Sequence, residues 1–385
     1  MAVATVDGMP KRLRVLLDVS AVPDNPVGAG VFTVALATGL TRDRSDIDLV
    51  LLARGNDADR WARLTPGAEV HAVVPGRRPM RLAWEQWSGP RLARKLKIDV
   101  WHGPHYTLPL RLSTPRVVTV HDLTFFTNPK WHEKNKVRYF RRMIRATVKR
   151  AAVTVCVSDA TAQQLAVYAP PSGPVRVIHH GVNHDRFAVA PEMAALDDAR
   201  LSVLGVRQPF ITFIGTLEPR KGLINLVDAF AEVASKYPDL QLVLAGSPGW
   251  GTAELDAAIT ACPSRDKILR TGYLPNDSVP SLLRRAAVVA YPSLDEGFGL
   301  PALEALACGA PLVASAVPAI GEVVGEAAVL VSPGDKAALV AGLNQALAPA
   351  ESERLRIAGP KRAAEFTWGK AVDSYAEVYE YARTK

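Results

Sequence analysis

The segment AVVAYPSLDEGFGLPALEALACGAPLVAS, residues 287–315, contains a strand-like run, a turn, a helical pattern and a second strand-like run. The first apolar run ends at Ser293. Pro301 then stands at the start of the helical pattern, a position that favours proline. Two short apolar strands on either side of a helix are typical of a βαβ unit, in which the strands are parallel.

The same alternation extends outward over most of the chain. Strand-like runs occur at 14–19, 49–53, 99–102, 116–121, 153–158 and 175–180, and again at 210–215, 240–246, 267–272, 287–293, 310–315 and 327–332. Helical patterns lie among them at 31–41, 84–96, 133–150, 159–168, 222–236, 252–260, 277–286, 301–308, 319–325 and 335–347. Runs that are apolar on both faces indicate parallel sheets covered by helices, so the fold class is α/β with two sheets.

The chain of 385 residues is longer than a single core usually grows, which favours two domains. A polar, alanine-rich connection ends near residue 208. We therefore predict a first domain at 1–190, a second at 205–367, and a C-terminal helix at about 368–385 that packs back across the boundary. Ligands of open α/β sheets bind outside the carboxyl ends of the strands, so functional residues should follow strands and face a cleft between the domains.

Composition narrows the class of protein. No run approaches the roughly 20 apolar residues of a membrane span, and the first residues, MAVATVDGMPKRLRV, lack the apolar core of a secretory signal, so a cytoplasmic location is expected. Cys156, Cys262 and Cys308 show no metal-binding or disulfide spacing and are predicted to be core residues.

The net charge of +8 is unevenly distributed. Residues 1–185 contain 27 Lys and Arg against 15 Asp and Glu, whereas the rest of the chain is net acidic. The 130–150 segment alone has nine basic residues and one acid, Glu133. Such a helix suits an anionic membrane surface or nucleic acid, and a solvated face that aids solubility is the simpler interpretation.

Four motifs follow strands. Gly28-Ala29-Gly30 opens a helical pattern, where backbone N–H groups favour an anion, although Thr33 replaces the last glycine of the dinucleotide fingerprint and a plain turn is the alternative.

The second motif is His121-Asp122, at the end of the 116–121 strand. His121 can donate to a substrate hydroxyl or carbonyl, while Asp122 orients it or caps the next segment; a structural histidine is the alternative.

The third motif, FITFIGTLEPRKG, places Gly215, Arg220 and Lys221 between a strand and a helix. Cations at a helix start oppose its dipole, so we expect an anion, such as a pyrophosphate, to compensate them; two solvated charges are the alternative.

The fourth motif is the opening segment, with Glu296 on its turn and Glu304 in the first turn of its helix. A carboxylate suits a vicinal diol of a sugar, because each oxygen accepts from one hydroxyl. Gly297 and Gly299 would permit close approach, and the amides around Phe298 and Leu300 could reach the same sugar. For Glu304, a contact with the helix dipole is the simpler alternative.

Together these motifs resemble a family-4 retaining glycosyltransferase of GT-B architecture, with two Rossmann-like domains facing a cleft. The resemblance covers nearly the whole chain through GAG, VHD, VSDAT, HHGVNHDRF, GTLEPRKG, LVLAG, GYLP and YPSLDEGFGLPALEALACGAPLVAS. It implies a hexosyltransferase that uses a nucleotide-sugar as substrate, with no cofactor and no required metal. The first choice is mannose from GDP-mannose, because VTVHDLTFF and VSDAT look like bacterial mannosyltransferases of this group.

The resemblance also implies roles. Arg220 and Lys221 would neutralise the donor pyrophosphate, Glu296 would hold a sugar hydroxyl, and Glu304 the ribose diol. His121 would contact the sugar, Gly28 and Gly30 would lie beside the distal phosphate, and the backbone of Tyr273 and Leu274 would meet the base. The acceptor, a lipid or saccharide of the cell envelope, would bind the basic first domain.

Alternatives remain open at this stage. The donor could be a UDP-sugar carrying glucose or N-acetylglucosamine. A nucleotide-sugar 2-epimerase would share the architecture, and a non-catalytic scaffold that binds membrane through the 130–150 segment would not need the donor motifs. No nucleic-acid partner is expected, and the oligomeric state is left undetermined.

Overall fold

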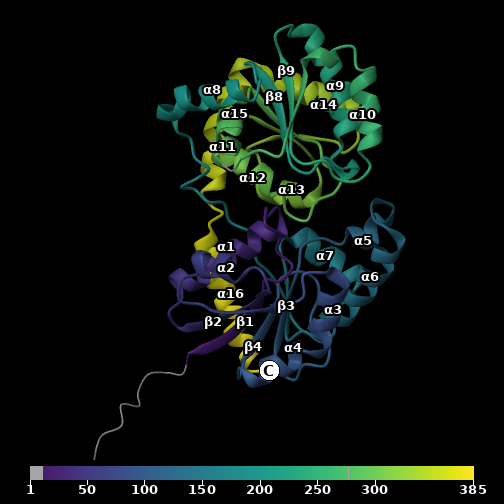
Figure 1. The fold of residues 1–385 in the computed structure, drawn as a ribbon. Helices are drawn as coiled ribbons and strands as arrows, with labels where there is room; N and C mark the ends of the chain where they lie inside the picture. Colours follow the sequence, from purple (N-terminus) through teal and green to yellow (C-terminus); the bar gives the residue numbers. More distant parts are fainter. Residues whose placement is uncertain (1–11, 276) are drawn as a thin grey trace, which may run out of the picture.

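The computed structural model describes residues 12–275 and 277–385. The first eleven residues lie outside this range. They include the start of the first predicted domain and most of the segment that was compared with a secretory signal. The described residues form two lobes, each built around its own sheet and stacked end to end (Figure 1).

The first lobe contains a seven-stranded parallel sheet with the order β3-β2-β1-β4-β5-β6-β7. Its strands are β1 Leu13–Asp18, β2 Ile47–Arg54, β3 Glu69–Val74, β4 Val100–Gly103, β5 Arg116–Val120, β6 Val153–Cys156 and β7 Val175–Val177. Its helices are α1 Ala29–Asp43, α2 Ala58–Leu64, α3 Arg78–Trp87, α4 Gly89–Lys95, α5 Thr124–Thr127, α6 Lys134–Val148 and α7 Asp159–Tyr168, with a 3₁₀ turn at Pro129–Trp131.

The second lobe contains a six-stranded parallel sheet with the order β10-β9-β8-β11-β12-β13. Its strands are β8 Phe210–Ile214, β9 Gln241–Ala245, β10 Ile268–Gly272, β11 Val288–Tyr291, β12 Leu312–Ser315 and β13 Val329–Val331. Its helices are α8 Ala194–Val203, α9 Leu223–Lys236, α10 Thr252–Ala261, α11 Ser278–Arg285, α12 Leu300–Ala307, α13 Pro318–Val324, α14 Lys336–Leu347 and α15 Pro349–Ala363. The two parallel sheets confirm the predicted fold class.

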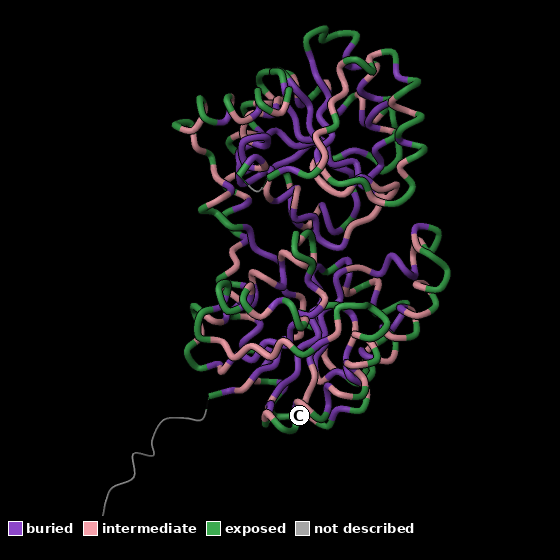
Figure 2. The backbone as a smooth tube through the Cα atoms, in the orientation of Figure 1, coloured by how far each residue is buried: buried purple, intermediate pink, exposed green. Residues whose placement is uncertain are grey.

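Both strand orders reverse direction at an inner strand, between β1 and β4 in the first sheet and between β8 and β11 in the second. The inner strands are buried because helices cover both faces of each sheet, as the purple centre of each lobe in Figure 2 shows. Ligands of such sheets bind at these switch points, so the fold places two binding edges toward the space between the lobes.

All twelve predicted strand runs form strands, although several elements, among them β3, α2, α5 and α8, were not predicted from the sequence. The edge strand β3 has the mixed sequence EVHAVV and mostly half-exposed residues, so it lacks the apolar run that marks a buried strand. The segment interpreted as a polar connection contains α8, which packs against α11 of the second lobe. The predicted domain limits at 190 and 205 themselves stay predictions.

The C-terminal helix α16, Trp368–Arg383, packs against α1, β4 and β5 of the first lobe, as expected, and is the yellow helix of that lobe in Figure 1. Tyr379 and Tyr375 are fully buried on it. The Tyr379 hydroxyl lies 2.7 Å from Nδ1 of His102, and the Tyr375 hydroxyl lies 3.0 Å from Oγ1 of Thr119. Hydrogen bonds and apolar burial therefore attach the end of the chain to the first sheet.

Candidate active site

A cleft of about 370 Å³ lies between the lobes and is lined by residues of both. It brings together nearly every residue that the sequence analysis selected: Gly28, His121, Gly215, Arg220, Lys221, Tyr273, Leu274, Glu296, Gly297, Phe298, Gly299, Leu300 and Glu304. Gly30 does not line the cleft. It lies in the first turn of α1, where an added Cβ would meet Pro26 at 3.1 Å.

The centre of the cleft is a group of opposite charges on two loops of the second lobe. Glu296 accepts hydrogen bonds from Lys221 Nζ at 2.5 Å and from Arg220 Nη1 at 2.9 Å. Tyr291 donates its hydroxyl to the same carboxylate at 2.8 Å, and Arg220 also pairs with Glu218 at 2.9 Å. The Glu296 side chain is only 8% exposed, so this group is largely removed from water.

The charges set one another's protonation state. Burial opposes ionisation of Glu296, but the charges of Arg220 and Lys221 outweigh it and lower its pKa to about 2. Burial also disfavours the Arg220 cation, yet Glu296 and Glu218 keep its pKa well above the ordinary value. Glu296 and Arg220 therefore stay ionised across the physiological pH range, while burial lowers the pKa of Lys221.

This arrangement revises one expectation. The sequence argument assigned the compensation of Arg220 and Lys221 to an anionic ligand, whereas Glu296 and Glu218 already compensate them. The two cations lie in the 3₁₀ turn Pro219–Lys221, ahead of α9 rather than within it. Arg220 also donates to the Asp295 carbonyl and Lys221 to the Tyr291 hydroxyl, so only the N–H groups left over from these bonds, out of five for Arg and three for Lys, can serve a phosphate.

Two glycines of the 295–299 turn are required by contacts within the protein. An added Cβ at Gly297 would lie 1.7 Å from the carbonyl oxygen of His121, across the two lobes. At Gly299, which has φ +106°, it would lie 2.4 Å from Ile320 Cδ1. The sequence analysis interpreted both glycines as room for a ligand, but here the close approach is between protein segments.

Three further contacts hold the lobes together. Ser158 donates its hydroxyl to the Gly297 carbonyl at 2.7 Å, and Asn128 donates to Asp295 Oδ2 at 3.1 Å. Glu322 on α13 accepts the backbone N–H groups of Asp159 and Ala160 at the start of α7, which satisfies two donors that a helix leaves unpaired. These contacts position the 295–299 turn directly against the end of β5.

Among the described residues, Asp159, His179 and Glu322 bring potential metal-ligand atoms within 4.8 Å of one another. None of the three lines the cleft, and both carboxylate oxygens of Glu322 accept backbone N–H groups. This group therefore belongs to the contact between the lobes, and the expectation that catalysis requires no metal stays a prediction.

His121 is buried at the end of β5, and its Nε2 lies 2.7 Å from the carbonyl oxygen of Pro104. A carbonyl only accepts, so Nε2 carries the proton. Burial lowers the pKa of His121, which favours the neutral ring. The remaining nitrogen, Nδ1, is then an acceptor, whereas the sequence analysis had treated the imidazole as a donor.

Asp122 and Tyr106 complete the first-lobe wall of the cleft. Asp122 Oδ1 accepts from the backbone N–H of Thr124 at 3.0 Å and from its hydroxyl at 2.7 Å, so it caps the following turn, one of its two predicted roles. Tyr106 has φ +65°, an uncommon value for a residue with a side chain, and its ring meets His121 edge to face. No local motif marks Tyr106, because its position follows from tertiary contacts.

Glu304, on α12, lines the cleft apart from the Glu296 group and is half-buried. Removal from water raises its pKa to about 7, and the positive charge of Arg186 only partly opposes this. The two glutamates of the opening motif thus have different environments: one is permanently charged within an ion group, and the other changes protonation state near neutrality.

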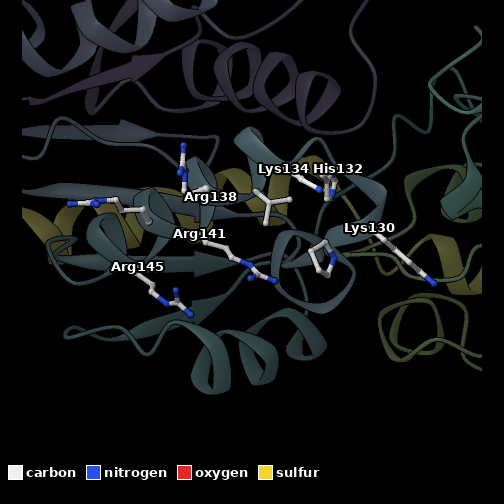
Figure 3. Close-up of a pocket in the computed structure, with 9 residues that line it drawn as sticks. Lys130, His132, Lys134, Arg138, Arg141 and Arg145 are labelled. Carbon is white, nitrogen blue, oxygen red and sulfur yellow. The ribbon is translucent and has the colours of Figure 1, made fainter.

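A basic hollow of about 800 Å³ lies on the first lobe, on α6 and the turn before it. It is lined by Pro129, Lys130, His132, Lys134, Val137, Arg138, Arg141, Arg142 and Arg145, and Figure 3 shows several of these side chains around it. In the described part of the chain, none of its Lys or Arg residues forms an ion pair with a carboxylate, since Glu133 pairs with Lys136. His132 lies close to the cleft wall, because its Nε2 lies 2.9 Å from the Thr124 hydroxyl, which donates to Asp122 of that wall at 2.7 Å.

Comparisons with known proteins agree with this geometry. Residues 26–186 match the family described as Glycosyltransferase Family 4, and residues 197–362 match Glycosyl transferases group 1. The O-antigen chain mannosyltransferase B of Escherichia coli is 31% identical over 78% of this chain and 77% of its own length. The chain therefore belongs to the family-4, group 1 glycosyltransferases.

Solved structures show the same fold at lower identity. Sucrose-phosphate synthase from Thermosynechococcus elongatus superposes with a TM-score of 0.78 and 20% identity, covering 96% of this chain and 98% of its own. The HepE protein of Anabaena in complex with UDP-glucose gives 0.75 and 19%, covering 96% of this chain and all of its own. These matches confirm the expected GT-B arrangement of two Rossmann-like lobes.

Among the described residues, no helix combines the length and the apolar character that crossing a bilayer requires.

The Gly297 contact can be tested by adding a single methyl group. We expect Gly297→Ala to separate the lobes, because its Cβ would overlap the His121 carbonyl, and small-angle scattering should show a larger radius of gyration. Gly321→Ala is the matched control, since an added Cβ there meets nothing within 4 Å. Equal scattering for both variants would show that the lobes are not held together at Gly297.

Proposed function

We propose that this protein is a retaining mannosyltransferase that transfers mannose from GDP-mannose to a lipid-linked or saccharide acceptor at the cytoplasmic face of a membrane. The observation that carries the proposal is the buried group of Arg220, Lys221 and Glu296 at the switch point of the second sheet. The printed name of the Escherichia coli relative supports mannose as the sugar. A role in cell-envelope polysaccharide or glycolipid synthesis would follow.

In this proposal the second lobe holds the donor. Arg220 and Lys221 bind the pyrophosphate with the N–H groups that Glu218 and Glu296 leave available, and Glu304 accepts the two ribose hydroxyls. Tyr273 and Leu274 line the part of the cleft assigned to the base. The 297–300 turn and Glu296 face the sugar.

The transfer proceeds on one face of the sugar. The acceptor oxygen forms a bond to the anomeric carbon while the bond from that carbon to the phosphate oxygen breaks, and the phosphate leaves with the bonding electrons. The acceptor proton passes to the departing phosphate, so that the products are the glycoside and the nucleoside diphosphate. Arg220 and Lys221 stabilise the charge that develops on the phosphate.

The environment of Glu296 supports this route over a covalent one. A retaining glycosidase needs a carboxylate nucleophile facing its acid partner across the bond, with the two carboxyl groups about 5 Å apart. Glu296 is held by two cations and a tyrosine hydroxyl, which makes it a weak nucleophile. The neutral His121 ring accepts a hydrogen bond from a sugar hydroxyl through Nδ1 and so orients the sugar.

A UDP-sugar is the second candidate donor, because the HepE structure that shares this fold holds UDP-glucose. A panel of GDP, UDP and ADP with their sugars in a thermal-shift assay separates the possibilities, since a ligand well above its Kd stabilises by a few kcal/mol. Release of nucleoside diphosphate only with an acceptor supports a transferase. Conversion of the free nucleotide-sugar without an acceptor would instead identify an epimerase.

Lys221→Ala tests the catalytic group directly. We expect kcat to fall about 10²- to 10³-fold, because a cation that stabilises the leaving phosphate is lost. Lys236→Ala, at the exposed end of α9, is the matched control and should keep wild-type turnover. Near wild-type kcat in a folded Lys221→Ala protein would contradict the assignment.

Because the pKa of Glu304 is about 7, we expect nucleotide binding to depend on pH. Ribose hydroxyls donate to the ionised carboxylate, so binding favours that form and releases a proton. With a pKa of about 7 before binding, affinity should rise about tenfold between pH 6 and pH 8, as measured by calorimetry. Glu304→Gln should bind more weakly at pH 8 and lose this slope, and an unchanged slope would remove Glu304 from the ribose site.

The basic hollow is the proposed membrane contact. Each Lys or Arg near an anionic surface contributes about 1 kcal/mol, and the hollow presents several without carboxylate partners among the described residues. His132 links the hollow through Thr124 to Asp122 of the cleft wall, so a lipid-linked acceptor bound at the hollow would lie next to the donor. The enzyme would then act as a peripheral protein.

Vesicle sedimentation tests this contact. Phosphatidylcholine vesicles containing phosphatidylglycerol should bind the protein, and binding should weaken with salt. The double change Arg138→Glu and Arg142→Glu should reduce binding about tenfold or more, whereas Lys236→Glu with Lys361→Glu, an equal charge change on the second lobe, should not. An equal loss of vesicle binding in the two double variants would mean that binding depends on the net charge of the protein and not on the hollow.

A further inference from the structure

A second cavity, of about 300 Å³, opens on the first lobe beside the donor cleft. It lies at the carboxyl ends of β1 and β4 and is closed by α3 and α6. Its polar wall includes Asp18, Ser20, Arg81, Glu85, His105 and Thr107. This volume is at the lower end of the range for small-molecule sites.

Three ionisable side chains line this cavity: Asp18 at the end of β1, and Arg81 and Glu85 on α3. Glu85 is 5% exposed and accepts from the Thr107 hydroxyl at 2.7 Å, while Asp18 accepts from the Ser20 hydroxyl at 2.6 Å. Arg81 donates to the Ser20 carbonyl at 3.2 Å.

Within the described residues, Arg81 forms no ion pair with either carboxylate, although it lies close enough to influence both. Asp18 and Arg81 are half-exposed, and Glu85 accepts from Gln86 Nε2 at 2.9 Å as well as from Thr107, so the cavity is lined by the remaining N–H groups of Arg81 and by lone pairs of the two acids. The space between Asp18, Arg81 and Glu85 is therefore suited to a ligand that both donates and accepts hydrogen bonds.

The cavity is adjacent to the reaction centre. His105 lines both this cavity and the donor cleft, and its ring lies 5.7 Å from that of His121. A ligand held by Asp18 and Glu85 would thus present its near side to the place where the donor sugar is expected.

We propose that this cavity binds the uncharged terminal sugar of a saccharide acceptor through Asp18, Arg81 and Glu85. The inference rests on the proposed glycosyl transfer and specifies its acceptor class. Carboxylates accept from vicinal hydroxyls and the guanidinium donates to ring or hydroxyl oxygens. A phosphate in the same place would face two acids, whereas the basic hollow on α6 offers it only cations.

The protonation of the cavity agrees with an uncharged ligand. Burial, and secondarily the charge of Asp18, raises the pKa of Glu85 to about 8, and burial raises the pKa of Asp18 as well. Because Glu85 is close to neutral when folded, Glu85→Gln should preserve the fold while removing a carboxyl group from the ligand site.

Saturation-transfer NMR provides the test. The probes are the methyl α-glycosides of mannose, glucose, galactose and N-acetylglucosamine, with mannose 6-phosphate as the charged comparison, each added to the full-length protein. The variants are Asp18→Asn and Glu85→Gln, with Glu377→Gln, an exposed acid on α16, as the matched control. Donor binding is followed separately by thermal shift with nucleotide-sugars.

We expect wild type and Glu377→Gln to bind at least one neutral glycoside, and both cavity variants to bind it about tenfold more weakly with unchanged donor binding. Stronger binding of mannose 6-phosphate than of every glycoside would overturn the proposal, as would equal binding by all variants or no glycoside binding at all. Absence of nucleotide-sugar binding by wild type would instead refute the proposed transferase function. The two failures are therefore distinguishable.

Discussion

The second-lobe wall of the cleft depends on one carboxylate, that of Glu296, which is held between the cations of Arg220 and Lys221. Glu296 would be costly to bury as an isolated charge, and so would Lys221, but together with Arg220 and the Tyr291 hydroxyl they satisfy one another. This group joins the loop after β8 to the loop after β11, which lie on adjacent strands at the switch point. The pairing leaves Arg220 and Lys221 fixed in position, with further N–H groups for a phosphate.

The same turn also connects the lobes. Gly297 touches the backbone of His121, and the Gly297 carbonyl accepts a hydrogen bond from Ser158. The 295–299 turn and the end of β5 therefore form one continuous contact. Glu296 and His121 are thereby brought to one place in the cleft. Catalytic geometry needs such pre-positioning, because small displacements of reacting groups carry large rate penalties.

Charge is distributed over three neighbouring sites according to what each would bind. The ion group in the cleft is balanced and rigid, the cavity beside it mixes two acids with a guanidinium, and the hollow on α6 is purely basic. The proposed occupant of the cleft is a nucleoside diphosphate, that of the cavity is an uncharged sugar, and that of the hollow is an anionic surface. The basic excess of the first half of the sequence is thus concentrated away from the site of chemistry.

The sequence alone determined the fold class and most of the cleft residues, because parallel strands leave long apolar runs and because the motifs follow strands whose ends meet at one edge. It also separated the two glutamates of DEGFGLPALE. The tertiary structure decided what local spacing cannot express: that Glu296 pairs with Arg220 and Lys221. Contacts between residues distant in the chain also decided that Gly297 serves the lobe contact and that Asp18, Arg81 and Glu85 share a cavity.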